Sequence, residues 1–275
     1  MYSRVYVEIT NICNMNCSFC HGHDRAPRQM TEAEYAHILR QLQGKTQYIY
    51  HHLMGEPLVH PLLPRFIQMA REAGFHPMLT TNGTLVDLRG EQLLGIGLHK
   101  VNISLHSFEG DQQDAHKRYI GKVADFAEKA NAAGTLISLR LWNNGCDEGR
   151  NETVLAHLRE RLPGPWTANT RGYRIRDGLF LEWGDRFDWP DLSAQEYDGA
   201  YKCYGLSDQI GVLCDGTVVP CCLDHEGDLA LGNLHTQTME EILASERAQA
   251  IFNGFSDHHA VEELCRKCGY ARRFG

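Results

Sequence analysis

Residues 5–20 read VYVEITNICNMNCSFC, a short β-type run followed at once by three cysteines. Cys13, Cys17 and Cys20 are spaced C-x3-C-x2-C, so one loop carries all three. Three thiolates on one loop can hold three corners of a cubane iron–sulfur cluster and leave the fourth iron open to another ligand. The alternative is a zinc site, with His21 or His23 as the fourth ligand.

The chain around this motif alternates β-type and helical runs from residue 3 to about 185. The expected strands cover residues 5–9, 47–53, 75–81, 100–106 and 135–141, with a weaker one near 179–181. Strand–helix alternation predicts a parallel sheet with crossover helices. Six units are too few for a closed eight-stranded barrel, so we expect an α/β fold with a partial, open (β/α)6 barrel. The chemistry of such folds sits at the C-terminal ends of the strands.

The pattern changes after about residue 190. We therefore expect two domains, a barrel over residues 1–190 and a small cysteine-rich α+β domain over residues 191–275. In the second, Asp215-Gly216 is a hairpin turn signal between two apolar runs. A single helix is expected over residues 238–252.

The composition limits the class of protein. The net charge is −8 and the hydrophobic fraction is 43%, which fits a globular chain with a real core and makes nucleic acid or an anionic membrane a poor partner. The N-terminus has no signal pattern and no run is long enough to span a membrane, so we expect a cytoplasmic protein. In a reducing cytoplasm, ten cysteines indicate metal sites.

The cysteine motif and its surroundings resemble the radical S-adenosylmethionine (SAM) superfamily. Phe19 stands where that family has an aromatic residue whose backbone contacts adenine. Residues 54–57, Met-Gly-Glu-Pro, follow the second expected strand, where the family has a Gly-Gly-Glu-Pro motif that binds the SAM amino group; Met54 replaces its first glycine. The resemblance implies that the three cysteines hold a [4Fe–4S] cluster and that Phe19, Gly55 and Glu56 bind SAM.

Strand counting extends the resemblance to two further residues. Ser104 and Arg140 lie on the fourth and fifth expected strands, where the family places ribose and carboxylate contacts to SAM. The alternatives are an ordinary strand residue for Ser104 and a surface charge for Arg140. The resemblance also implies reductive cleavage of SAM to a 5′-deoxyadenosyl radical, with a reductant such as flavodoxin or ferredoxin as partner.

Four of the six cysteines after residue 200 resemble the SPASM domain, in its shortened twitch form. They are Cys203, Cys221, Cys265 and Cys268. The resemblance implies one auxiliary [4Fe–4S] cluster; a structural zinc site with the same ligands is the alternative. Cys222 should point away from its neighbour Cys221, because adjacent strand residues face opposite ways. Cys146, Cys214 and Cys222 are expected to be buried apolar groups, although Cys214 or Cys222 could donate a hydrogen atom to a substrate radical.

Three residues are candidates for catalysis. His52 and His106 lie at the ends of the second and fourth strands, although most of the 15 histidines must be surface or packing residues. Arg186 precedes Cys203 by a distance similar to that of an active-site arginine in twitch-type cyclitol dehydrogenases; a salt bridge is the alternative role.

Three functions follow from these features. The first is oxidation or epimerisation of an alcohol carbon in a small polar substrate, in which a base takes the hydroxyl proton and, for oxidation, the auxiliary cluster takes the remaining electron. The second is radical modification of a peptide or protein, although the first strand begins almost at Met1 and leaves no room for an N-terminal peptide-recognition module. The third is a non-catalytic iron–sulfur or zinc protein.

Overall fold

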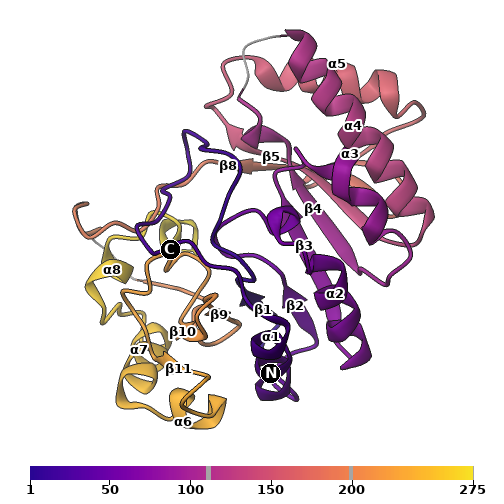
Figure 1. Cartoon of the computed structure of the whole chain (residues 1–275). Coiled ribbons are helices and arrows are strands. Elements are labelled where there is room, and N and C mark those ends of the chain that lie inside the picture. Colours follow the sequence, from indigo (N-terminus) through magenta and orange to yellow (C-terminus); the bar gives the residue numbers. More distant parts are fainter. Residues whose placement is uncertain (110–112, 198–200, 275) are drawn as a thin grey trace.

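The computed structural model describes residues 1–109, 113–197 and 201–274. Its strands form one sheet in the order β11-β10-β9-β1-β2-β3-β4-β5-β8-β7-β6 (Figure 1). The six predicted parallel strands are present side by side at its centre and confirm the expected fold class. They are β1 (Arg4–Val7), β2 (Tyr48–Tyr50), β3 (His76–Thr81), β4 (Lys100–Ser104), β5 (Leu136–Asn144) and β8 (Leu179–Asp185).

Helices follow the first five parallel strands, as crossover connections require. They are α1 (Glu32–Gln41), α2 (Leu63–Glu72), α3 (Val86–Arg89), α4 (Gln113–Ala132) and α5 (Arg150–Arg161). Thr31 caps α1, because its hydroxyl accepts a hydrogen bond from the Glu34 N–H while the Glu34 carboxylate accepts one from the Thr31 N–H. In Figure 1, α2, α3, α4 and α5 lie along the same side of the sheet.

Alternation along the strands gives the sheet two different faces. Val5 and Val7 of β1 belong to the main apolar core, which includes residues of the covering helices. Tyr6, between them, belongs to a second, smaller apolar cluster together with Met54 and Val219. The face without the crossover helices therefore holds the start of the motif at residues 54–57 and part of the C-terminal region.

The C-terminal region joins the barrel sheet. Its hairpin, β9 (Gln209–Val212) and β10 (Thr217–Val219), is confirmed. The strand β9 pairs in parallel with β1, and β10 pairs with β11 (Gly232–Asn233). The expected cysteine-rich domain is thus continuous with the barrel through backbone hydrogen bonds.

The observed secondary structure differs from the expected one in several details. The helix over residues 238–252 is two helices, α6 (Met239–Leu243) and α7 (Glu246–Ser256), because the Ser245 hydroxyl accepts a hydrogen bond from the Ala248 N–H and starts a new helix. The strand at 47–53 is shorter, since only Tyr48–Tyr50 pairs. An unexpected antiparallel pair, β6 (Thr167–Asn169) and β7 (Gly172–Arg176), extends the sheet beyond β8.

The helix α8 (Glu263–Arg266) carries Cys265, and Cys268 follows two residues after its end. Within the described parts of the chain, we find no helix with both the length and the apolarity needed to cross a bilayer.

Candidate active site

The three cysteines of the N-terminal motif line one cavity of about 360 Å³ at the C-terminal ends of the parallel strands. The same cavity is lined by residues that follow β2, β3 and β4, including His52, Gly55, Glu56, Asn82 and Ser104. Segments far apart in the sequence therefore converge where an α/β sheet places its chemistry.

The thiols of this cavity suit a polynuclear iron site. Burial raises the pKa of Cys17 to about 11, and Cys20 and Cys13 add to the rise. Cationic iron relieves both effects, because it binds the thiolate form. Over the described residues, no group of three or more Cys, His, Asp or Glu side chains is placed to hold a single metal ion. A cubane differs, since each cysteine binds a different iron.

The cysteine-bearing loop is held by contacts from several elements. The Asn82 amide donates to the Asn14 side-chain oxygen at 3.0 Å, and the Ser18 N–H donates to the Glu109 carboxylate at 2.8 Å. The indole N–H of Trp189 donates to the Phe19 carbonyl at 3.0 Å. The sequence did not single out Glu109 or Trp189, because these contacts join residues 91 and 170 positions apart.

The turn at residues 54–57 packs directly against the end of β1. Gly55 has a φ of +73°, and a Cβ at that position would lie 2.4 Å from the Thr10 carbonyl oxygen. The Met54 side chain packs in the second apolar cluster, away from the backbone contact that requires glycine. The substitution of the family's first glycine by Met54 is therefore accommodated here.

Glu56 is buried and fixes the turn to the next strand. Its carboxylate accepts hydrogen bonds from the Leu58 N–H at 2.9 Å, the Thr81 hydroxyl at 2.7 Å and the Asn82 N–H at 2.7 Å. Burial raises the pKa of Glu56, and the three hydrogen bonds lower it but only partly offset the effect of burial. These contacts join the Gly55–Glu56 turn to the segment after β3 and give the cavity a preorganised wall.

We expect Gly55→Ala to destabilise the cluster-free protein by about 1–3 kcal/mol, because the left-handed backbone and the Thr10 carbonyl both oppose a side chain. Denaturant unfolding of the apoprotein measures the change. Gly44→Ala is the matched control, since Gly44 has a φ of +72° and open space around its Cβ position. Equal losses in the two variants would show that the close contact with Thr10 contributes nothing.

Of the residues expected to contact SAM or substrate, Ser104 and His52 line the cluster cavity, whereas Arg140 does not line it and pairs with Ser104 across β4 and β5. The Arg140 side chain is 17% exposed, so the surface-charge alternative is wrong. Its guanidinium lies 4.4 Å from the Trp142 ring centre and its Nε 3.8 Å from the Glu182 carboxylate. Burial lowers the pKa of Arg140, and burial together with the Arg140 charge lowers the pKa of His52 to about 3.

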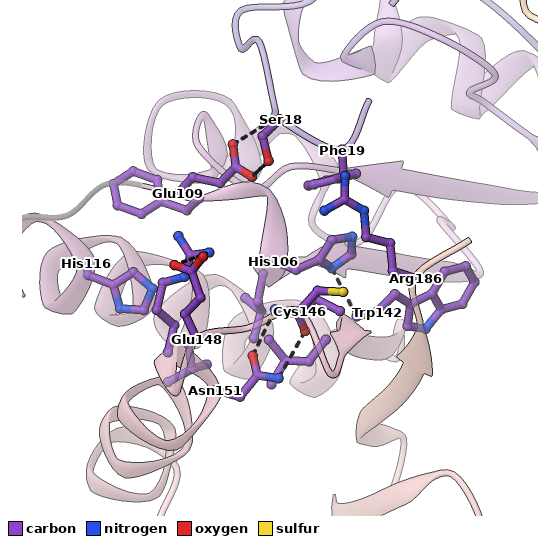
Figure 2. Close-up of a pocket in the computed structure, with 16 residues that line it drawn as sticks. Ser18, Phe19, His106, Glu109, His116, Trp142, Cys146, Glu148, Asn151 and Arg186 are labelled. Carbon is purple, nitrogen blue, oxygen red and sulfur yellow. Dashed lines mark hydrogen bonds and ion pairs between the residues drawn. The ribbon is translucent and has the colours of Figure 1, made fainter. Parts of the chain in front are cut away.

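A second cavity, of about 110 Å³, adjoins the first at Phe19. Figure 2 shows Arg186 extending toward Phe19 and His106, with Cys146 beneath them. The His106 Nδ1 lies 3.1 Å from the Arg140 carbonyl oxygen, and burial lowers the pKa of His106 to about 4, so the ring is neutral near pH 7.

The three catalytic candidates thus do not form one group. His52 lines the cluster cavity, whereas His106 and Arg186 line the second cavity. Cys146, expected to be buried, is exposed and lines the second cavity. Its environment differs from the expectation because it follows β5 in a turn at the cavity rather than packing under the sheet.

The four later cysteines, Cys203, Cys221, Cys265 and Cys268, line a third, mainly apolar cavity in the C-terminal region. Burial raises the pKa of each thiol, to about 11 for Cys268, and repulsion by neighbouring thiols adds to the rise at Cys221, Cys265 and Cys268. The Gly205 N–H donates to the Cys203 sulfur at 3.3 Å. Such a set of thiols fits an iron–sulfur cluster, whose positive irons stabilise the thiolates.

The remaining two cysteines of this region point elsewhere. Cys222 does not line the third cavity among the described residues, and its thiol hydrogen-bonds with the Tyr6 hydroxyl. Cys214 is buried, as expected. Both residues lie beyond the end of β10, Cys221 in a bend and Cys222 in a turn, so their different environments arise from this turn and not from the strand alternation that the sequence suggested.

Comparison with protein families matches two parts of the chain. Residues 7–145 match the radical SAM superfamily. Residues 203–269 match the iron–sulfur cluster-binding domain SPASM. The two matches cover the cysteine loop with β2 to β5 and all four cysteines of the third cavity.

Solved structures share the fold at low sequence identity. BtrN in complex with AdoMet and 2-DOIA aligns with a TM-score of 0.63 and 18% identity over 98% of this chain and 93% of BtrN. The enzyme anSMEcpe with bound AdoMet and the Kp18Cys peptide aligns with a TM-score of 0.62 and 17% identity over 99% of this chain and 88% of that one.

Curated relatives match part of the chain. A probable GTP 3′,8-cyclase of Methanocella arvoryzae is 34% identical over 168 residues, 57% of this chain and 53% of the relative. A GTP 3′,8-cyclase of Chlorobaculum tepidum is 31% identical over 113 residues, 39% of this chain and 34% of the relative. The matches thus span about a third to a half of these relatives.

Proposed function

The chain belongs to the radical SAM superfamily, and from this premise we propose that it oxidises or epimerises an alcohol carbon of a small polar substrate. The family and its SPASM domain bring [4Fe–4S] clusters and SAM as cofactors. When bound, these cofactors supply the carbon radical that takes a hydrogen atom from the substrate.

The cofactor ligands are proposed from the geometry above. Cys13, Cys17 and Cys20 would hold the cluster that binds SAM, and the thiols of the third cavity would hold one auxiliary cluster. Phe19, Gly55, Glu56 and Ser104 line the cavity that would receive SAM, and Arg140, which pairs with Ser104 on the neighbouring strand, would be the cationic group for the SAM carboxylate.

The substrate class rests on one observation, the size and polarity of the second cavity. At about 110 Å³ it is smaller than the cluster cavity of about 360 Å³, so it suits a small metabolite or part of one. Its wall carries a neutral imidazole at His106, a carboxylate at Glu109 and a guanidinium at Arg186. Hydroxyl groups both donate and accept hydrogen bonds, so an alcohol can pair with all three.

The low pKa values of His52 and His106, about 3 and about 4, define what these rings do. A ring held neutral by burial hydrogen-bonds to a hydroxyl but stores a proton poorly. We therefore assign His106 to orientation of the substrate in the second cavity, and Arg186, which lines the same cavity, to the contact with the reacting hydroxyl. His52 lines the cluster cavity, where its neutral ring can hydrogen-bond to a polar group that enters from the second cavity.

The test is deuterium transfer. Reconstituted protein is incubated under strong reductant with SAM and carbon-deuterated sugars or cyclitols, and 5′-deoxyadenosine is analysed by mass spectrometry. We expect deuterium from at least one alcohol. GTP and a deuterated peptide are the other arms, because the relatives are named as GTP cyclases and a structural neighbour holds a peptide.

The outcomes separate the three functions. Transfer from the peptide alone, or conversion of GTP alone, would contradict the alcohol substrate and leave the radical chemistry intact. No cleavage of SAM in any arm would contradict catalysis itself and favour a non-catalytic iron–sulfur protein.

A further inference from the structure

The carboxylate of Glu8 lies where three functional segments meet, and none of the roles above uses it. Glu8 follows β1 directly and its side chain is 0% exposed. A buried carboxylate is costly unless positive charge and hydrogen-bond donors surround it. Four N–H groups from three segments reach its two oxygens.

The first segment is the cysteine-bearing loop. The Arg25 guanidinium donates from Nη2 to Glu8 Oε1 at 2.6 Å and from Nη1 to Oε2 at 2.8 Å, a two-pronged ion pair. The second is the turn that holds Gly55, whose preceding residue Met54 donates its N–H to Oε1 at 3.2 Å. The third is the C-terminal hairpin, where the Cys214 N–H donates to Oε2 at 3.1 Å.

Arg25 extends this junction into the C-terminal region. Its Nε donates a hydrogen bond to the His225 carbonyl oxygen at 2.7 Å, so all three guanidinium nitrogens of Arg25 are hydrogen-bonded. Arg28 adds a bond from its Nε to the Cys214 carbonyl at 2.8 Å. The end of the loop that carries the cluster cysteines is therefore fastened to both the barrel and the C-terminal hairpin.

The loop depends on such contacts because it has no regular structure of its own. Residues 11–28 contain no helix and no strand. A segment without backbone ladders keeps its geometry only through tertiary contacts. The Glu8–Arg25 ion pair is a buried contact of this loop, since the two side chains are 0% and 15% exposed. Solvent therefore screens the attraction between the two charges only a little.

We infer that Glu8 is a positioning residue for SAM binding. Through Arg25 it holds the cysteine loop, and through the Met54 N–H it holds the Gly55–Glu56 turn, so it fixes the separation between the cluster and the amino-group end of SAM. Glu8 itself does not line the cluster cavity. The inference rests on the two cofactor-binding segments alone and holds for any substrate, so a failure of the alcohol hypothesis leaves it unaffected.

The test is SAM affinity at constant cluster content. Anaerobically reconstituted Glu8→Gln is reduced and titrated with SAM while the electron paramagnetic resonance spectrum of the cluster is followed. We expect the iron content of the wild type but roughly tenfold more SAM for the half-maximal spectral change, the loss of one charge-assisted contact. Glu32→Gln is the matched control, because Glu32 forms an exposed pair with Arg65 at 2.9 Å.

A second measurement uses the cluster-free protein. Amide hydrogen exchange over residues 11–28 should be faster in Glu8→Gln than in the wild type, with the core strands unchanged. Arg25→Gln should weaken SAM binding to the same extent, and the double variant should be no worse than either single one, because the two groups act as one unit.

Arg25→Lys is the second variant for the SAM titration if Glu8→Gln does not fold. A lysine keeps the positive charge but cannot bridge Glu8 and the His225 carbonyl oxygen as the planar guanidinium of Arg25 does. Wild-type SAM affinity in a folded Glu8→Gln or in Arg25→Lys would overturn the inference. Loss of iron in proportion to the loss of SAM binding would also overturn it, because Glu8 would then serve cluster assembly.

Discussion

Cys17→Ala is expected to abolish cleavage of SAM. The three thiols of the loop share one cavity, and Cys17 lies close enough to Cys13 and Cys20 for each to raise its pKa. Removing one leaves two protein ligands, too few to hold a cubane in place and keep a single iron open. Loss of a residue that merely supports a metal ligand typically lowers metal affinity or activity by about 10–100-fold. Loss of a ligand itself should therefore lower the rate of SAM cleavage by more than about 100-fold.

The measurement is 5′-deoxyadenosine formed by anaerobically reconstituted protein under dithionite, alongside the iron content. Cys222→Ala is the control, because that thiol faces Tyr6 and lines neither cysteine cavity among the described residues. We expect the control to cleave SAM at the wild-type rate. Undiminished cleavage by Cys17→Ala would remove this cysteine from the cluster site and the ligand set with it.

The central strands were predictable because their signal is local. Runs such as residues 75–81 and 135–141 are rich in apolar residues, each directly follows a glycine, and they are separated by helices of regular period. The β6–β7 pair gave no such signal, since Thr167–Asn169 is exposed throughout and its pairing depends on β8. The helix break at Ser245 was hidden for a similar reason, because serine is tolerated within a helix as well as at its start.

The cysteine sets were also predictable, because metal ligands recur at fixed spacing along the chain. The contacts that place them were not. Glu8 and Arg25 meet only after the loop has folded back. Glu8 then contacts Cys214, 206 positions later, and Arg25 contacts His225, 200 positions later. From the sequence alone, a lone acidic residue such as Glu8 at the end of a strand is expected to be a surface charge, and only the structure shows that it is buried.

Burial likewise decides what the histidines do. His51 and His52 are adjacent, yet His51 hydrogen-bonds with the Tyr35 hydroxyl at 2.6 Å in the core, whereas His52 lines the cluster cavity. Strand alternation predicts that they face opposite ways. It does not say which face the cavity occupies, which depends on the helices covering the other side.

Cys268→Ala is expected to separate the two halves of the reaction, with SAM cleavage retained within about threefold and product formation reduced more than about tenfold. The third cavity shares no lining residue with the cluster cavity among the described parts of the chain. Loss of one of its four thiols should therefore destabilise the proposed auxiliary cluster and leave the SAM site intact. The iron content should fall by about the content of one cluster.

The assay measures 5′-deoxyadenosine and product in the same reaction, with the substrate identified by deuterium transfer. Glu263→Gln is the control, since Glu263 lies on α8 beside Cys265 with its side chain 56% exposed. A full yield of product from Cys268→Ala would show that the auxiliary site has no part in turnover. If SAM cleavage and product formation fell together in Cys268→Ala, the two cysteine sites would not have separate roles, and the C-terminal region would act on the SAM site. The hydrogen bonds of Arg25 and Arg28 to carbonyl oxygens of the C-terminal region offer a direct route for such an effect.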